Sequence, residues 1–172
     1  MDLEKLKYPI GQFVMPEVFD VHQVEIWISE IEALPEHIQK ATENLSDEDL
    51  NLTYRPGGWT LRQVIHHIPD SHMNAYIRFK QAFTEEIPII KPYHEELWAE
   101  THEAKTGGVL MSILLLSALH QRWVAFLKTL NMEDYQRKYI HPAQEIELSL
   151  ANMLGMYAWH GKHHLAHITN TI

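Results

Sequence analysis

Apolar residues recur every three or four positions along four stretches of the chain, which is the spacing of amphipathic helices. These stretches cover residues 21–44, 61–83, 109–130 and 150–170. In the first, Pro35 suits the first turn of a helix, so this stretch is one continuing helix or two successive ones. In the second, an internal Pro69 should kink the helix. The pattern predicts an all-α protein, an up-down four-helix bundle with helices about 20° from antiparallel.

The segments between these helices have other patterns. The first twenty residues contain two prolines and a glycine among apolar residues and are expected to form an extended arm. Ser46 followed by Asp49 predicts a short helical turn. Polar and apolar residues alternate on both sides of Pro142, within 137–149, and suggest a short β-hairpin or an extended crossover before the last helix. The stretch 109–130 is the most apolar, so we expect that helix to be the most buried.

Composition fits one globular domain spanning residues 1–172, with 45% hydrophobic and 22% charged residues. The net charge of −9 disfavours nucleic acid and anionic membranes as partners, because both require a basic surface. The chain has no cysteine, which excludes disulfides, thiolate ligands and a cysteine nucleophile. The N-terminus lacks an apolar signal core, and the apolar run 109–119 is too short to span a membrane. A soluble cytoplasmic protein is expected.

The last helix carries four histidines within eight residues, His160, His163, His164 and His167. His160 and His164 are four apart and share the face of Met153, Tyr157 and Ile168, so they are predicted to point inward. His163 and His167 fall on a more polar face and are predicted to lie in solvent. Gly161 beside the pair should let a neighbouring helix approach closely.

Two inward imidazoles one turn apart can share a metal ion, and a third ligand could come from His66 or His67. The apolar stripe of that helix does not separate these two residues. The alternative is that the histidines are hydrogen-bonded core residues without a metal. Three imidazoles suit Zn²⁺, Ni²⁺, Fe²⁺ or Co²⁺ and leave a coordination position open for a water of lowered pKa.

Asp70 lies one turn after His67. It could orient a ligand imidazole or accept a proton, which makes it a candidate catalytic residue. Equally, it could be a solvated acid paired with Arg62 or a lysine. The acids at 95, 96, 100 and 103 are expected to form a solvated face.

Two motifs stand out in the helices with histidines: Gly58-Trp59-Thr60 through His66-His67-Ile68-Pro69-Asp70, and Trp159-His160-Gly161-Lys162-His163-His164. They resemble the metal-binding helices of the DinB/YfiT superfamily. Two other motifs, Tyr8-Pro9-Ile10-Gly11 and Tyr76-Ile77-Arg78-Phe79-Lys80, resemble its YfiT branch in particular. The resemblance implies a four-helix bundle that binds one Ni²⁺ or Zn²⁺ per chain and is often a homodimer. It assigns the metal ligands to His67, His160 and His164, and so selects His67 over His66.

Three functions are compatible with such a site. The first is a metal-dependent hydrolase in which activated water attacks a small polar substrate, as the resemblance implies. The second is an S-transferase that binds a low-molecular-weight thiol, such as bacillithiol, and directs it at an electrophile. The third is a non-catalytic metal-binding protein, although an open three-histidine site is unusual for that role.

Overall fold

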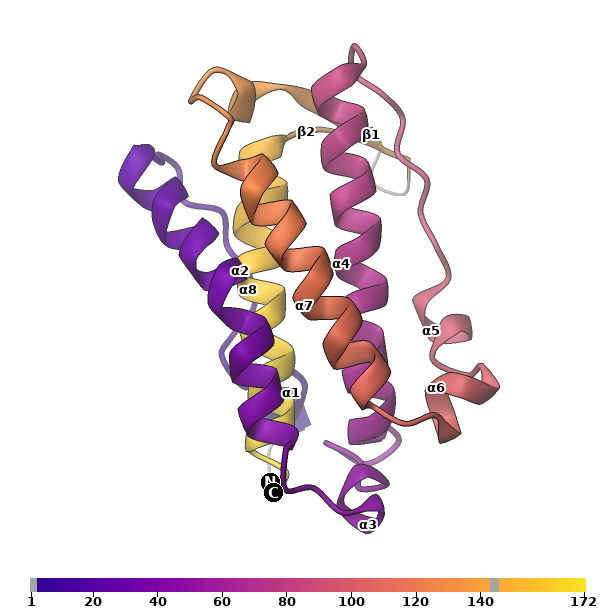
Figure 1. Cartoon of the computed structure of the whole chain (residues 1–172). Coiled ribbons are helices and arrows are strands. Elements are labelled where there is room, and N and C mark those ends of the chain that lie inside the picture. The colour runs from indigo at the N-terminus through magenta and orange to yellow at the C-terminus, as the bar shows by residue number, and fades with distance from the viewer. Residues whose placement is uncertain (1–2, 143–145) are drawn as a thin grey trace.

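Four long helices form a bundle in the computed structural model, which describes residues 3–142 and 146–172 (Figure 1). They are α2 (Val21–Thr42), α4 (Leu61–Thr84), α7 (Leu110–Leu127) and α8 (Leu150–Thr169). The predicted all-α four-helix bundle is confirmed. Helix α2 continues through Pro35, and α4 likewise continues through Pro69 as one helix.

Around the bundle, α2 contacts α7 and α8, and α4 contacts the same two helices. Two glycines of α8 show how α2 and α8 lie together: Gly155 faces Trp27, and Gly161 faces Leu34. Because both numbers rise together, α2 and α8 run parallel. A Cβ atom at Gly161 would lie 2.5 Å from Leu34 Cδ2, so the close approach expected at this glycine is present.

Helices α4 and α7 are also parallel neighbours. His66 near the start of α4 contacts Ser112 near the start of α7, and Phe83 near the end of α4 packs on Phe126. The chain achieves this because residues 85–109 return along the side of the bundle, carrying α5 (Glu95–Trp98) and α6 (His102–Thr106) (Figure 1). The order therefore differs from a simple up-down bundle, in which all neighbours are antiparallel.

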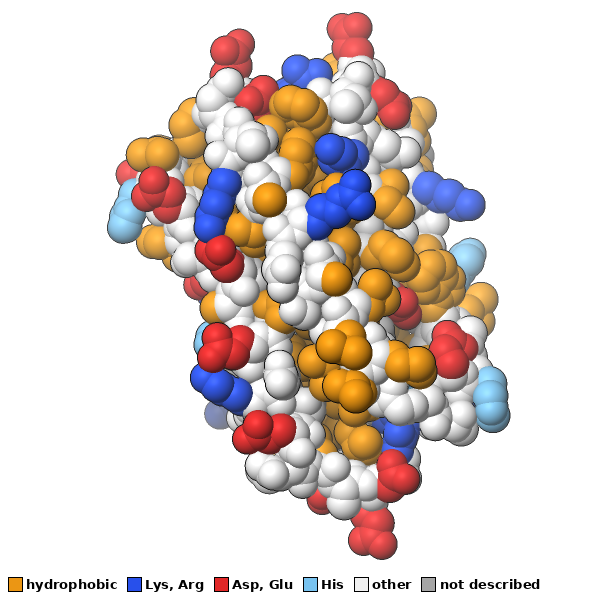
Figure 2. All heavy atoms as spheres, in the orientation of Figure 1, with side chains coloured by type: hydrophobic (Ala, Val, Ile, Leu, Met, Phe, Trp, Pro, Cys, Tyr) orange, Lys and Arg blue, Asp and Glu red, His pale blue; other side chains and the backbone are white. Residues whose placement is uncertain are grey.

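Helix α7 is less buried than its composition predicts. Four large apolar side chains in its first half are exposed, namely Leu110, Met111, Leu114 and Leu115. Figure 2 shows hydrophobic side chains gathered over this part of the surface. The expectation that α7 is the most buried helix is wrong, because it packs on α2 and α4 through one face only. Helix α7 is also long and apolar enough to cross a membrane, a test that core helices of soluble proteins pass too.

Short elements close the ends of the bundle. Helix α1 (Leu3–Lys7) lies where the sequence predicted an extended arm, and α3 (Asp47–Leu50) begins with the predicted Ser46–Asp49 capping box. A 3₁₀ helix, η1 (Asp134–Gln136), precedes the hairpin of β1 (Lys138–His141) and β2 (Ile146–Ser149). The strands pair antiparallel, as predicted. Of the turn expected near Pro142, residues 143–145 lie outside the described residues.

The apolar core divides into two clusters, with a layer of histidines between them. On α4 one cluster ends at Ile68 and the other begins at Ala75, and on α7 the corresponding limits are Leu116 and Trp123. Histidines occupy these intervals and the matching part of α8: His72, His120 and His164, which are buried, and His160, which is partly buried. The polar layer therefore lies inside the bundle.

Candidate metal centre

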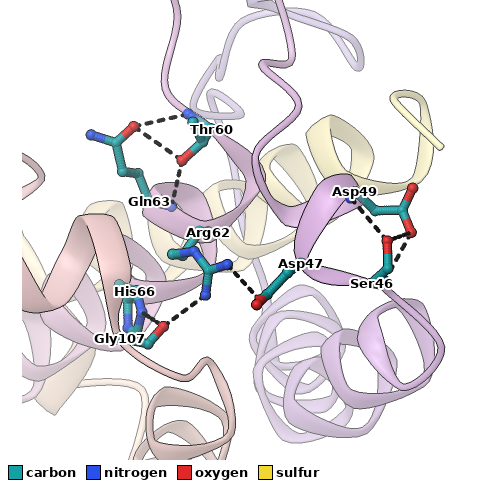
Figure 3. Close-up of polar contacts among 8 residues, drawn as sticks. All are labelled: Ser46, Asp47, Asp49, Thr60, Arg62, Gln63, His66 and Gly107. Carbon is teal, nitrogen blue, oxygen red and sulfur yellow. Dashed lines mark hydrogen bonds and ion pairs between the residues drawn. The ribbon is translucent and has the colours of Figure 1, made fainter.

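The start of α4 is fixed by side chains (Figure 3). Thr60 and Gln63 form a capping box, in which each side chain contacts the other residue's backbone. Arg62 donates to an Asp47 carboxylate oxygen at 2.8 Å and to the Gly107 carbonyl at 2.9 Å. These contacts satisfy helix-end donors and fix the rotation of α4 about its axis.

His66 is turned away from α8. Its Nε2 lies 3.2 Å from the Gly107 carbonyl at the end of α6 (Figure 3). Its Nδ1 lies 2.7 Å from Ser112 Oγ in α7, so both ring nitrogens are engaged. The next residue along a helix points about 100° away. His67 accordingly faces α8, where its Nε2 lies 3.3 Å from His160 Nε2.

The structure brings His67, His160 and His164 together. One ring nitrogen from each lies within 4.8 Å of the other two, a separation that one metal ion can bridge. His67 and His164 are buried, and His160 is partly buried. Two candidate ligands one turn apart on α8 and one on α4 lie between facing helices, the usual place for metal sites in bundles.

Burial keeps these imidazoles neutral at ordinary pH. It lowers the pKa of His67 to about 4. It also lowers the pKa of His160 and of His164 well below the usual range, with the neighbouring histidines adding to the effect. Neutral imidazole is the form that binds metal, since one ring nitrogen then has a free lone pair.

A cavity of about 430 Å³ opens beside the three histidines. Trp59 and Trp159 form part of its wall, and Arg55, Glu95 and Glu96 supply charged groups. Trp59 packs against the His67 ring, with ring centres 4.8 Å apart. The cavity is large enough for a small molecule and combines apolar walls with a few polar groups, as ligand sites do.

The prediction that His163 and His167 lie in solvent is wrong: they are 7% and 3% exposed. The Tyr54 ring stacks on His167 at 4.0 Å, and Trp159 stacks on His163 at 4.5 Å. The carbonyl of Lys7 in α1 lies 3.1 Å from His167 Nε2. Helical periodicity could not reveal this burial, because the covering groups come from distant segments.

Asp70 is only three positions after His67 in the sequence. It is not among the described residues that line the cavity. Burial raises its pKa to about 6, with the nearby Glu103 charge adding to the shift. The alternative pairing with Arg62 is wrong, because Arg62 pairs with Asp47. The role of Asp70 in catalysis stays a prediction.

Some residues at the site carried no sequence signal. Glu95 and Glu96 are exposed, as expected of a solvated face, but they also line the cavity, because the 85–109 segment returns past α4. His72 and His120 lie 2.9 Å apart, although 48 positions separate them in the chain. Contacts of this kind depend on tertiary structure and cannot be deduced from local spacing.

Comparison with known proteins identifies the family of the chain. The family model of the DinB superfamily matches residues 30–168, which includes all three candidate ligands. The chain belongs to the DinB superfamily.

Relatives in Bacillus extend this result. A Bacillus cereus strain 03BB102 protein named "Putative metal-dependent hydrolase" is 49% identical over 168 residues, covering 98% of this chain and 96% of the relative. A Bacillus anthracis strain CDC 684 protein of the same name gives the same identity and coverage. At a coarse level, this DinB-superfamily chain is therefore a metal-dependent enzyme.

The solved structure of YfiT from Bacillus subtilis has the same fold, with a TM-score of 0.95 and 45% sequence identity. The match covers 97% of this chain and 95% of YfiT. YfiT is described as "a probable metal-dependent hydrolase with an unusual four-helix bundle topology". In this chain, the parallel neighbours are α2–α8 and α4–α7.

Proposed function

We propose that this protein is a metal-dependent hydrolase of a small polar molecule, in which His67, His160 and His164 hold one Ni²⁺ or Zn²⁺ ion. The observation that carries the proposal is the meeting of three neutral imidazoles beside an open cavity. Imidazole nitrogen suits both ions, and three protein ligands leave a position for a substrate or water. A divalent ion bound there supplies Lewis acidity and activates water for hydrolysis.

The chain's own residues supply the rest of the site. Trp59 and Trp159 wall the cavity and exclude bulk water from the reacting groups. Arg55 and Glu96 offer charges of opposite sign to a polar substrate. Glu95 is the carboxylate best placed to accept or return a proton, because it lines the cavity and burial raises its pKa.

The roles of Glu95 and Asp70 can be separated by isosteric substitutions. Glu95→Gln is expected to reduce kcat by about 100-fold or more, the usual contribution of a general acid or base. Asp70→Asn is expected to have a smaller effect, because Asp70 does not line the described cavity. The reverse order of effects would move the proton-transfer role to Asp70.

Elemental analysis of the purified protein tests the metal ligands. Wild type should contain one ion per chain, and His67→Ala, His160→Ala and His164→Ala should each lose it. His94→Ala is the matched control, since that side chain is 79% exposed. Stoichiometric metal in all three ligand variants would overturn the site.

A substrate panel tests the reaction. Metal-dependent turnover of esters or amides without added thiol supports hydrolysis, whereas turnover only with a low-molecular-weight thiol identifies an S-transferase. If neither occurs and metal removal lowers the melting temperature, the ion is structural. A cytoplasmic location, homodimerisation and the choice between Ni²⁺ and Zn²⁺ stay predictions.

A further inference from the structure

Both α8 histidines of the proposed centre use a second ring nitrogen away from it. His160 Nδ1 lies 3.1 Å from His72 Nε2, and His164 Nδ1 lies 3.3 Å from His167 Nδ1. A histidine bound to a metal through one nitrogen commonly donates its other N–H to a neighbouring group. Here that neighbour is another histidine in both cases, which can itself donate or accept.

The first contact continues across the bundle. His72 Nδ1 lies 2.9 Å from His120 Nε2, and His120 Nδ1 lies 2.6 Å from the main-chain oxygen of Ile31 in α2. Three histidines from α8, α4 and α7 are thus joined to a carbonyl on the fourth helix. We name this series, His160–His72–His120–Ile31 O, the long relay.

The carbonyl at its end determines where every proton lies. A carbonyl can only accept, so His120 Nδ1 must carry the hydrogen. A neutral imidazole has one N–H, so His120 Nε2 accepts from His72 Nδ1. His72 Nε2 then accepts from His160 Nδ1, which leaves a lone pair on His160 Nε2. That nitrogen is the one that lies 3.3 Å from His67 Nε2.

A second series, His164–His167–Lys7 O, fixes the proton position of the other α8 histidine, and we name it the short relay. His167 Nε2 lies 3.1 Å from the Lys7 carbonyl and must donate to it. His167 Nδ1 then accepts from His164 Nδ1, which leaves the lone pair of His164 on Nε2. The two relays use different helices and different carbonyls, yet both give a ligand protonated on Nδ1.

Water cannot replace these partners. His72, His120 and His167 are 0%, 1% and 3% exposed, so each ring nitrogen must find its partner within the protein. A buried polar atom without a partner would destabilise the fold. Reversing a relay would leave an unprotonated ring nitrogen facing the terminal carbonyl, two acceptors without a donor between them, and would move the N–H of His160 or His164 to Nε2.

We propose that His72, His120 and His167 are positioning residues, which hold His160 and His164 as Nδ1–H tautomers with Nε2 lone pairs available to the ion. The inference rests on the proposed metal site. The inference also bears on whether a second cluster binds an ion. This cluster is His163, His164 and His167, with one nitrogen from each within 4.8 Å of the others. Because both nitrogens of His167 are engaged, this cluster holds no ion and the chain binds one.

Nuclear magnetic resonance of the metal-free, full-length protein tests the relays directly. Long-range ¹H–¹⁵N spectra distinguish the protonated from the unprotonated ring nitrogen of each histidine. His72, His120, His160 and His164 should be Nδ1–H tautomers, and His167 should be the opposite Nε2–H tautomer. An Nε2–H tautomer at His160 or His164 would overturn the proposal, whether or not the protein binds metal.

Paired variants test the consequence for the ion. His120→Leu and His167→Leu break the relays and are expected to weaken Zn²⁺ affinity by about 10- to 100-fold in a chelator competition. His120→Gln and His167→Gln keep a donor and an acceptor, so they should recover most of that loss. Wild-type affinity in both folded Leu variants would contradict the relays.

Two further outcomes separate this proposal from the metal site itself. If wild type binds no ion, the proposed function fails while the tautomer pattern still tests the relays. If wild type binds two ions and His167→Leu removes one, the short relay is wrong and the second cluster is a metal site. If a Leu variant does not fold, the tautomers of the wild type decide.

Discussion

Helices α7 and α8 differ in burial, and in the opposite direction to the hydrophobicity of their sequences. Helix α7 is the more apolar, yet Leu110, Met111 and Leu114 in its first half are exposed. Helix α8 carries four histidines in eight residues, yet His163, His164 and His167 are buried. The reason is the number of neighbours: α7 packs on α2 and α4, whereas α8 also contacts η1 and β2 and is covered by α1. Burial follows position in the bundle rather than hydrophobicity.

The comparison also shows where polar groups are tolerated. Helix α7 buries one histidine, His120, which is hydrogen-bonded at both ring nitrogens. Helix α8 can bury several because each has a partner or faces the cavity. The most histidine-rich helix is therefore more enclosed than the most apolar one.

Acidification of the metal-free protein should lower its free energy of unfolding, because the buried histidines are neutral in the folded state. We expect this to be the largest effect on stability. Burial holds the pKa of His67 and of His120 at about 4, whereas an unfolded histidine titrates near 6.5. Between these values the unfolded chain binds more protons, so the free energy of unfolding falls as pH drops from 6.5 to 4. His120 alone accounts for about 3 kcal/mol over this range.

Asp70 opposes this trend, because its raised pKa of about 6 lets the folded state bind a proton first. One carboxyl cannot offset several histidines. Urea unfolding at pH 7.5 and pH 5 measures the net effect, and His120→Gln should reduce the difference. Greater stability at pH 5 would show that the histidine layer is not buried in solution.

Matched truncations in α8 and α7 test the difference in burial directly. Leu154→Ala in α8 should destabilise the fold by about 2–5 kcal/mol, since Leu154 is fully buried. Leu114→Ala in α7 should change stability by about 0.5 kcal/mol or less, since Leu114 is 61% exposed. Equal losses in chemical denaturation would mean that α7 is covered in solution.

The close contact between α8 and α2 should respond to a single methyl group. Gly161→Ala places a Cβ atom against Leu34, and the strain, offset in part by better helix propensity, should cost about 1 kcal/mol. Gly108→Ala is the control, because nothing lies within 4 Å of its added Cβ. A Gly161→Ala variant as stable as wild type would show that Leu34 moves aside freely.

The exposed face of α7 offers a test with little effect on monomer stability. Leu114→Lys should leave the free energy of unfolding within about 0.5 kcal/mol of wild type. If the predicted homodimer uses this face, the variant should be monomeric in analytical ultracentrifugation. A dimer of unchanged affinity would place the interface elsewhere.

Much of the fold could be predicted from local chemistry. The capping residues Thr60 and Ser149 mark the starts of α4 and α8, and alternation around Pro142 marks the hairpin. The i, i+4 pair His160–His164 needed only helical geometry to be placed on one face. The choice of His67 over His66 came from resemblance, because the apolar stripe of α4 runs close to both.

The remaining features depend on contacts between distant segments. His167 is buried because Lys7 and Tyr54 cover it, and His120 reaches His72 across the bundle. The parallel pairing of α4 with α7 depends on where residues 85–109 run. No window of one helix contains this information, so periodicity assigned His167 to solvent and left His120 unremarked.

The parallel pairing of α2 with α8 has a consequence for folding kinetics. Trp27 and Gly155 touch although 155 − 27 = 128 positions separate them. Such a contact closes a long loop, and proteins rich in distant contacts fold more slowly than bundles joined by short turns. This protein should therefore fold slowly for an all-helical chain.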